Sequence, residues 1–369
     1  MAIANARLLL LAPFLIIVNA CTNEPEKSPY VLNLPSNSIS IIAVGDIMLG
    51  GTAQEVLQKT DYNYPFKHVT PLLTHADVVI GNLEGPLTSI CNNSMDLDKQ
   101  YVFRSPAAKV APALSKAGFN LLSLANNHIL DYGVNGMNDT LDALSKHNID
   151  TVGVGNNLSE ARAGTTIDTS NGKLGFLSYS LTFPERFWAT DTKPGTAFGH
   201  QQQIIEDVKR LKQVSDSVIV SFHWGREKTT ELRPYQPKLA RAAIDAGASI
   251  VLGHHPHVLQ AIEQYQGGLI IYSLGNFVFG SYSKDASTSM VARITLLNGI
   301  FYSAEFTPIN VLNNDVLFQP KILTNNAATA VIDHINRLSQ TSNTRLVLQN
   351  SRGYLQASQI KIQSLLRNN

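Results

Sequence analysis

Short apolar runs alternate with amphipathic stretches along most of the chain, and glycine, proline and polar residues separate them. Apolar, β-branched runs predict buried strands, whereas apolar residues spaced three and four positions apart predict helices. The predicted strands are 38–44, 77–80, 119–124, 150–154, 217–222 and 249–252. The predicted helices are 106–117, 137–147, 201–214 and 237–246. Strands and helices that alternate in this way predict an α/β fold.

Antiparallel elements are predicted in the second half of the chain. The stretches 165–180 and 261–273 each contain a two-residue turn, Asn-Gly and Gly-Gly respectively, between β-prone runs, which predicts a hairpin. Residues 290–321 predict further antiparallel strands. Residues 327–338 and 354–366 predict helices in a tail where no chemistry is visible.

Polar side chains follow five of the predicted strands at the point where each apolar run ends. They are Asp46, Asn82 and Glu84, Asn127 and His128, His223, and the histidines of the sequence VLGHHPH, which ends at His257. The carboxyl ends of strands are where α/β sheets carry their chemistry. One such coincidence means little, but five are hard to explain by structural roles alone. The pattern therefore predicts a functional site where these strand ends meet.

Carboxylate, amide and imidazole ligands together suit hard or borderline divalent ions, and this set contains no thiolate. We therefore predict one or two divalent ions, with Mn, Fe, Zn and Mg as candidates. A bridging carboxylate would hold two ions roughly 3.5–4 Å apart, the geometry used for phosphoryl displacement. The irregular, aromatic-rich residues 182–200 are interpreted as a lid or an entrance wall.

Each candidate also has a structural interpretation. The alternatives are a helix cap for Asp46, a surface charge for Glu84, a tight turn for Asn127 and His128, and a core role for His223. His254 and His255 compete for one ligand place. Glu227 and Asn276 suit supporting or turn positions better than ligand positions.

The first residues are typical of a targeting segment. Arg7 precedes an apolar run, 8–18, that is too short for a comfortable membrane span. The sequence Val-Asn-Ala-Cys that ends at Cys21 resembles a bacterial lipobox, so we predict that Cys21 is lipidated. An ordinary secretory signal and an uncleaved anchor are the alternatives. A lipid anchor would place the protein in the cell envelope, held on the membrane without spanning it.

The predicted organisation has four parts. Residues 1–20 form the signal peptide, 21–38 a polar, proline-containing tether, 39–322 the main domain, and 323–369 a C-terminal helical tail. Without residues 1–20 the chain carries 28 basic and 28 acidic side chains, which argues against a nucleic-acid partner. Cys91 is the only other cysteine, so a lipidated Cys21 leaves no internal disulfide.

Six sequence motifs, found in this order over about residues 41–280, carry a family resemblance: AVGDIMLG, IGNLEGPLT, LANNHILDYG, FHWGRE, GHHPHVLQ and YSLGNFVFG. They look like those of the CapA/PgsA capsule-synthesis family, whose fold is related to the calcineurin-like metallophosphoesterases. The resemblance implies a four-layer α/β/β/α sandwich. It also implies a role in making or exporting an anionic polymer, poly-γ-glutamate in the best-known members. The implied partners are that polymer or its synthase complex.

The resemblance also implies roles for single residues. The implied metal ligands are Asp46, Glu84, Asn127, His223, His255 and His257; the predicted catalytic residues are His128 and Asp131; and the predicted substrate-binding residues are Asn82, Arg226 and Asn276. Met48 departs from the pattern, because it stands where the phosphoesterases place a histidine ligand. The second motif also departs from it, because Gly-Asn-Leu-Glu replaces the usual Gly-Asp start.

The function predicted from the sequence is therefore that of an envelope protein in anionic-polymer synthesis or export, with a metallophosphoesterase-type site. Catalysis stays open between three hypotheses. A metal-dependent hydrolase would act on phosphoester bonds; a non-catalytic scaffold would bind the polymer or its synthase through a degenerate site; and a third kind of protein would cleave or transfer the amide bonds of the polymer.

Overall fold

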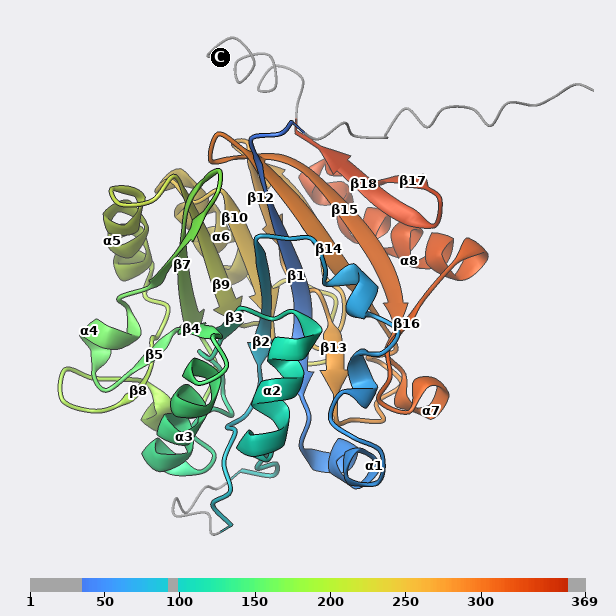
Figure 1. Cartoon of the computed structure of the whole chain (residues 1–369). Coiled ribbons are helices and arrows are strands. Elements are labelled where there is room, and N and C mark those ends of the chain that lie inside the picture. The colour runs from blue at the N-terminus through green and yellow to red at the C-terminus, as the bar shows by residue number, and fades with distance from the viewer. Residues whose placement is uncertain (1–34, 92–98, 358–369) are drawn as a thin grey trace, which may run out of the picture. The chain divides into compact units, whose positions relative to one another are not determined.

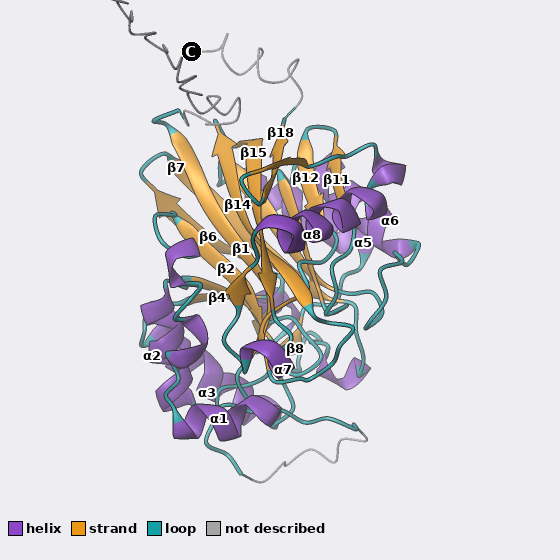
Figure 2. Cartoon of the chain, turned by 90° about the vertical axis from the view of Figure 1, so that its right-hand side faces the viewer, coloured by secondary structure: helices purple, strands orange, loops and turns teal. Residues whose placement is uncertain are grey.

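Two β-sheets stacked face to face occupy the centre of the structure (Figure 1, Figure 2). The structure is a computed structural model, and it describes residues 35–91 and 99–357. The ten-stranded sheet is built from strands at both ends of the described chain. In spatial order its strands are β17 (Val347–Gln349), β18 (Arg352–Gln356), β15 (Ile300–Asn310), β14 (Thr288–Leu297), β1 (Ser38–Met48), β2 (Val78–Leu83), β3 (Leu121–Ser123) and β4 (Asp150–Val152), with β13 (Asn276–Phe279) beside β1 and β16 (Lys321–Ile322) beside β15.

The six-stranded sheet comes from the middle of the chain. Its order is β11 (Ile262–Tyr265), β12 (Gly268–Ile271), β10 (Ile250–His254), β9 (Ser217–His223), β7 (Gly172–Ser180) and β6 (Thr165–Thr169). Strands β7, β9, β10 and β12 run parallel, while β6–β7 and β11–β12 are antiparallel pairs, as the two turn signals predict. A separate two-stranded ribbon pairs β5 (Val154–Gly155) with β8 (Gly195–Thr196), which lies in the irregular region 182–200.

Strand β1 explains why the sheets stack. Ile39 and Ile41 pack into the core between the two sheets, whereas Ile42 and Val44 pack against the helices on the opposite face. Because alternate side chains of a strand point to opposite faces, a strand covered on both sides is apolar at successive positions, as in residues 41–44 of β1.

Helices cover the outer face of each sheet (Figure 2). On the ten-stranded sheet they are α1 (Gln54–Lys59), α2 (Ala107–Ala117) and α3 (Gly133–Ser145); on the six-stranded sheet they are α5 (Gln201–Lys212) and α6 (Tyr235–Asp245). Helix α8 (Asn325–Leu338) packs its apolar side chains into the core between the sheets. The layers follow the order α/β/β/α, which confirms the predicted four-layer fold.

The short helices are α4 (Leu158–Ala161), α7 (Asn313–Val316) and the 3₁₀ turns η1 (Gly51–Ala53), η2 (Tyr64–Phe66), η3 (Thr70–Leu72), η4 (Glu185–Phe187) and η5 (Gln340–Ser342). Residues 182–200 contain only η4 and β8, in agreement with the predicted irregular insertion. Within the described ranges, no helix is both long enough and apolar enough to cross a membrane.

One predicted helix is wrong. Residues 354–356 do not begin a helix, because they belong to β18, which pairs with β15 and extends the ten-stranded sheet. The run Gly-Tyr-Leu places Tyr354 and Leu355 on opposite faces of a strand, and Leu355 enters the core between the sheets. The remainder of that predicted helix, the signal peptide, Cys21 and the tether up to residue 34 lie outside the described residues.

Candidate metal centre

Strand β1 changes its neighbour just before Asp46. Its first part pairs with β14, and from Asp46 onward it pairs with β13 instead. A Cβ atom on Gly45 would lie 1.9 Å from the carbonyl oxygen of Gly275, so only glycine allows the two segments to come this close. The backbone N–H of Asp46 donates to that carbonyl at 3.0 Å. Gly45 thereby fixes the position from which the fully buried Asp46 carboxylate projects.

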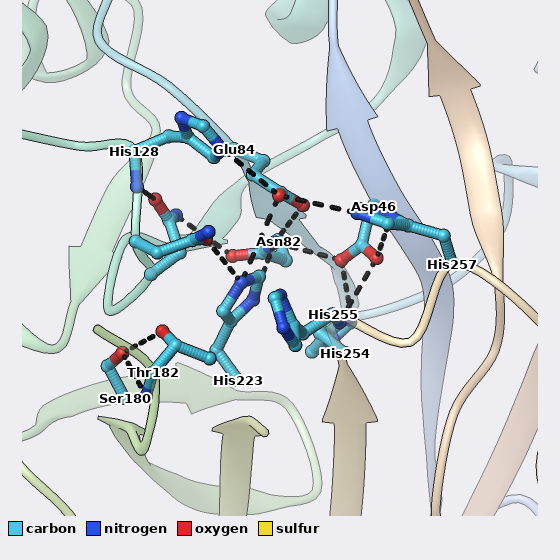
Figure 3. Close-up of polar contacts among 12 residues, drawn as sticks. Asp46, Asn82, Glu84, His128, Ser180, Thr182, His223, His254, His255 and His257 are labelled. Atoms are coloured by element: carbon cyan, nitrogen blue, oxygen red, sulfur yellow. Dashed lines mark hydrogen bonds and ion pairs between the residues drawn. The ribbon is translucent and has the colours of Figure 1, made fainter. Parts of the chain in front are cut away.

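Strand β2 brings Asn82 and Glu84 beside Asp46 (Figure 3). The Asn82 amide donates to Asp46 Oδ1 at 2.9 Å and to Glu84 Oε2 at 3.4 Å, so it bridges two buried carboxyl groups. Its own Oδ1 accepts a hydrogen bond from Asn126 at 3.1 Å. Asn82 is fully buried and engaged at both ends. This geometry suits holding the carboxylates in place more than touching a substrate.

The turn after β3 is organised by Asn126, a residue to which sequence reasoning gives no role. Its side-chain oxygen accepts from the backbone N–H groups of His128 and Ile129 at 3.0 and 2.9 Å, and its amide donates to Leu83 O at 2.8 Å. Asparagine side chains commonly cap their own turns in this way, and that tendency is the signal that could have identified Asn126. As a result, Asn127 and His128 lie beside the ends of β2 and β9.

The six-stranded sheet supplies the histidines. His223 Nδ1 lies 3.2 Å from the Asn82 amide nitrogen, and His223 Nε2 lies 2.9 Å from Asn127 Oδ1. After β10 the backbone of His255 and His257 has positive φ values of 91° and 60°. Such values are uncommon for residues other than glycine and concentrate at functional sites. They turn both rings back toward Asp46 and Glu84 (Figure 3).

Two overlapping sets of side chains can each hold a cation. We call Glu84, His223 and His255 the inner group, since all three are buried, and Asp46, Glu84 and His257 the outer group, since the His257 side chain is 12% exposed. In each group the potential ligand atoms lie within 4.8 Å of one another. Exposed Glu227 forms a third such set with His255 and His257. Glu84 is common to the inner and outer groups.

Unpaired buried atoms support the fit to a cation. Among the described residues, Glu84 Oε1 and His255 Nδ1 are buried without a hydrogen-bond partner, and so are both ring nitrogens of His254. Buried polar groups are normally paired, and unpaired ones call for an explanation such as a bound ion. Glu84 Oε1 lies 3.7 Å from His257 Nε2, 3.9 Å from His223 Nε2 and 4.0 Å from His128 Nε2. The donor set therefore fits a divalent cation.

The protonation states of the outer group are coupled. Burial, together with the neighbouring negative charge of Asp46, raises the pKa of Glu84 well above its ordinary value. Burial opposes a charged His257, but Glu84 and Asp46 raise the pKa of His257 to about 9. Burial likewise opposes a charged Asp46, yet interactions with His254 and His257 hold its pKa well below the usual range. The outer group therefore holds protons at neutral pH that a cation must displace.

The two imidazoles of the inner group are neutral at neutral pH. Burial and the charge of His257 lower the pKa of His255 to about 3, and burial and His255 lower the pKa of His223 well below its ordinary value. Neutral imidazole is the form that binds metal ions.

His128 and Asp131 form a pair at the edge of the cluster. His128 Nδ1 lies 2.7 Å from Asp131 Oδ2, which also accepts from the backbone N–H of Phe103 at 2.8 Å. Burial lowers the pKa of His128, and Asp131 partly opposes the shift. Lys99, whose side chain is 13% exposed, donates to Asp131 and to Asn127 O. Sequence reasoning gives Lys99 no role.

The remaining predicted residues divide into two kinds. Asn276 begins β13, and its Oδ1 accepts from His257 Nδ1 at 2.9 Å. Arg226 is exposed, and within the described chain it has no hydrogen bond or ion pair with the cluster. Met48 is buried, with its Cε beside Gly51 and Gly280. Because it is a methionine, it offers the outer group a thioether and no imidazole. Asp46, Asn82, Glu84, Asn127, His128, Asp131, His223, His255, His257 and Asn276 are thus brought together, and Arg226 is not.

The structure is a four-layer sandwich that gathers carboxylate, amide and imidazole side chains, a donor set that suits a divalent cation, at the strand ends of both sheets. The sequence model of the family described as bacterial capsule synthesis protein PGA_cap matches residues 40–281, so the chain belongs to this family. The capsule biosynthesis protein CapA of Bacillus anthracis is 32% identical over 301 residues, which cover 80% of this chain and 73% of that protein. The PGA biosynthesis protein CapA of Bacillus subtilis (strain 168) is 36% identical over 287 residues, which cover 77% and 75% respectively.

Solved structures resemble the chain more distantly. The calcineurin-like phosphoesterase YfkN from Bacillus subtilis has a TM-score of 0.42 and 13% sequence identity, with 83% of this chain and 97% of that chain covered. A likeness at this level carries no argument about the chemistry of the chain. Its family membership places it among the proteins of bacterial capsule polymer synthesis.

Proposed function

We propose that this protein is a divalent-metal-dependent hydrolase of phosphoester bonds that works in the synthesis or export of an anionic envelope polymer such as poly-γ-glutamate. One observation carries the proposal: Glu84 belongs to both the inner and the outer group of potential ligands. A carboxylate shared by two neighbouring cation positions is the arrangement used for hydrolytic displacement at phosphorus.

The residues that would hold the cations are those of the inner and outer groups, with Asn127 beside His223. Mn, Fe, Zn and Mg are all compatible with these ligand types. A bound divalent cation supplies Lewis acidity toward a phosphoryl or carbonyl oxygen.

His128 is the proposed acid–base residue. His128 Nδ1 lies 2.7 Å from Asp131 Oδ2 and 3.0 Å from Lys99 Nζ, and these contacts orient the imidazole and leave Nε2 facing Glu84 Oε1 at 4.0 Å. Nε2 is therefore the atom that exchanges a proton with the reacting group. A base held by a third group in this way is the usual arrangement in acid–base catalysis. Asp131 acts through His128, and Lys99 balances the charge of Asp131.

A second candidate function is that of a non-catalytic scaffold that binds the polymer or its synthase. Met48 favours it, because the outer group lacks the histidine that the family resemblance to phosphoesterases would place there. A thioether is a poor ligand for hard ions, so the outer position is the weaker of the two. This candidate keeps the inner cation as a structural element and requires no turnover.

We further propose that the protein is anchored in the bacterial envelope through a lipidated Cys21 and works beside the polymer or its synthase complex there. The lipobox-like sequence before Cys21 and the membership in a capsule synthesis family support this location. A Cys21→Ser variant should move from the membrane fraction to the soluble fraction of the host. A variant that stays in the membrane fraction would contradict the lipid anchor.

The experiment that tests the proposed function measures metal content and hydrolysis together. The full-length protein is purified in mild detergent without chelators, beside Asp46→Ala, His128→Gln and, as a control, the exposed His68→Gln. We expect one or two equivalents of a transition metal in the wild type and in His68→Gln, and less in Asp46→Ala. His128→Gln should keep its metal and lose about 10²-fold or more in kcat on the best phosphoester.

Two results would reject the hydrolase. Absence of bound metal after reloading with Mn, Zn and Fe removes the basis of the proposal. Normal metal content without hydrolysis of any phosphoester, combined with retention on immobilised polymer, would establish the scaffold instead.

A further inference from the structure

A cavity of about 550 Å³ opens directly onto the outer group. Glu84, His128 and His257 line it on the side of the outer group, which we call the floor. Tyr101 and Phe103 line one wall, and residues 279–283 with Ala286, from the end of β13 onward, line another; the rest of the lining is Gly51, Thr52, Glu227, Lys228 and Asn276. A group that occupies the cavity lies beside the outer cation position.

The walls are aromatic. Tyr101 and Phe103 stack with their ring centroids 6.1 Å apart and an angle of 7° between the rings. Phe103 packs on the imidazole of His128 at 4.6 Å, and Phe279 packs on that of His257 at 4.5 Å. Each wall therefore contacts a histidine of the floor through an aromatic ring.

The rim leaves aromatic surface exposed to solvent. Tyr101 is 59% exposed, and Tyr282, which lines the cavity from the other segment and packs edge-on against Phe318 at 5.3 Å, is 44% exposed. Tyrosine combines a large flat apolar face with a hydroxyl that stays hydrated, so rings can be held here without burying a charge. Two exposed aromatic rings that line the same cavity indicate a binding surface.

The charge of the lining argues against a polyanion inside the cavity. Beyond the floor, the charged residues that line it within the described chain are Glu227 and Lys228, which have opposite signs. Its other polar groups include the hydroxyls of Thr52, Ser281 and Ser283, which are neutral. A chain of carboxylates would need several cations along its path, and the cavity supplies one. Its lining matches an uncharged, flat group.

We infer that this cavity is a specificity subsite for an uncharged ring, aromatic or sugar-like, joined through one carbon to the ester oxygen of the bond that is hydrolysed. The inference rests on the proposed function and adds its substrate class. The ring lies between Tyr101 and Tyr282, its hydroxyl or ring oxygen atoms meet the neutral hydroxyl groups of the cavity, and the ester group reaches the floor. Flexible open-chain esters of the same size gain no stacking and lose more conformational entropy on binding.

Matched ester pairs test the inference. Benzyl phosphate is compared with heptyl phosphate, and glucose 6-phosphate with sorbitol 6-phosphate, because each pair keeps a primary leaving oxygen and changes only the ring. We expect kcat/KM to favour the ring ester in at least one pair by about tenfold. In the Tyr101→Ala/Tyr282→Ala double variant that preference should fall to about twofold or less. Tyr265→Ala, a partly exposed tyrosine of β11 outside the cavity, should retain it.

The pair that shows the preference distinguishes an aromatic ring from a sugar ring. Equal rates within both pairs, or a preference that survives in the double variant, would overturn the inference. Binding of benzyl alcohol and methyl glucoside, measured by saturation-transfer NMR, separates this result from failure of the proposed function. Ring binding that is lost in the double variant, without hydrolysis of any ester, keeps the subsite and rejects the hydrolase. Absence of ring binding beside active hydrolysis rejects the subsite alone.

Discussion

The inner and outer groups share Glu84 but differ in burial and in protonation. The inner group is closed, and the pKa values of His223 and His255 lie well below neutral, so both rings are ready to bind a cation. The outer group faces the cavity, and the pKa of His257 is raised to about 9. Asp46 and Asn276 already occupy Nδ1 of His257 at 3.2 and 2.9 Å.

This difference indicates a division of roles. A closed position with neutral imidazoles would keep a cation, because no imidazolium proton has to be displaced and water has little access. An open position that must lose a proton would exchange its cation more readily and would meet the substrate. Under the proposed function, Glu84 would join a structural cation position to a reactive one.

Removal of the shared carboxylate should have the largest effect. Glu84→Gln keeps the size of the side chain and removes its charge, so both positions should weaken together. We expect metal affinity to fall by more than about 100-fold, since even residues that only support ligands contribute 10- to 100-fold. Titration with Mn, followed by isothermal calorimetry, measures the loss, and the exposed Glu55→Gln is the control. Loss of only one equivalent would show that Glu84 is not shared.

The two positions should also respond differently to pH. A raised pKa keeps His257 protonated below about pH 9, so a cation at the outer group competes with that proton and its affinity rises with pH. The slope should approach tenfold per pH unit for each displaced proton. At the inner group burial keeps the pKa values of both imidazoles low, so no imidazolium proton has to be displaced and the affinity should depend less on pH.

Single-histidine variants separate these slopes. His223→Ala should leave the outer position, with the steeper pH dependence, and His257→Ala should leave the inner one, with the shallower. Calorimetry in two buffers with different ionisation enthalpies counts the protons released, and the expected difference is about one proton per cation. Equal proton release in the two variants would remove the distinction between the groups.

The smallest expected effect is an increase in cation affinity at the outer group. Met48→His, made together with His223→Ala, should tighten binding at the outer group by about tenfold, because an imidazole is a better ligand than a thioether for these ions. Met48 lies beside Gly51 and Gly280, which both line the cavity above the outer group. Met48→Leu, which conserves volume, should leave the affinity unchanged. Equal cation affinity in the Met48→His and Met48→Leu variants would mean that position 48 does not face the cation.

The sequence predicts which side chains lie together at the strand ends, for a physical reason. Asp46, Glu84, His128, His223 and His257 each follow an apolar run, and parallel strands deliver their carboxyl ends to one edge. The local sequence pattern is therefore enough to predict that these residues lie together, provided that the sheets are predicted correctly. The choice of His255 over His254 also agrees with the groups of potential ligands, which include only His255.

Features that depend on long-range contacts were not predictable in the same way. The role of Asn126 requires the backbone of β2 beside it, and that of Lys99 requires Asp131 and Asn127. The sequence of β18 predicts a helix, because the pairing with β15 that makes it a strand involves residues far away in the chain. Arg226, next to a predicted ligand strand, turns out to be exposed because the chain leaves the site there.

Both groups of ligands draw on both sheets: Asp46 and Glu84 come from the ten-stranded sheet, and His223, His255 and His257 come from the six-stranded one. A cation at either position would link the two sheets through its ligands. A cation that binds only the folded protein would stabilise it by about 2.7 kcal/mol when the free ion is at 100 times its Kd. In an envelope where ion supply varies, the abundance of intact protein would follow the availability of the metal even before any substrate is met.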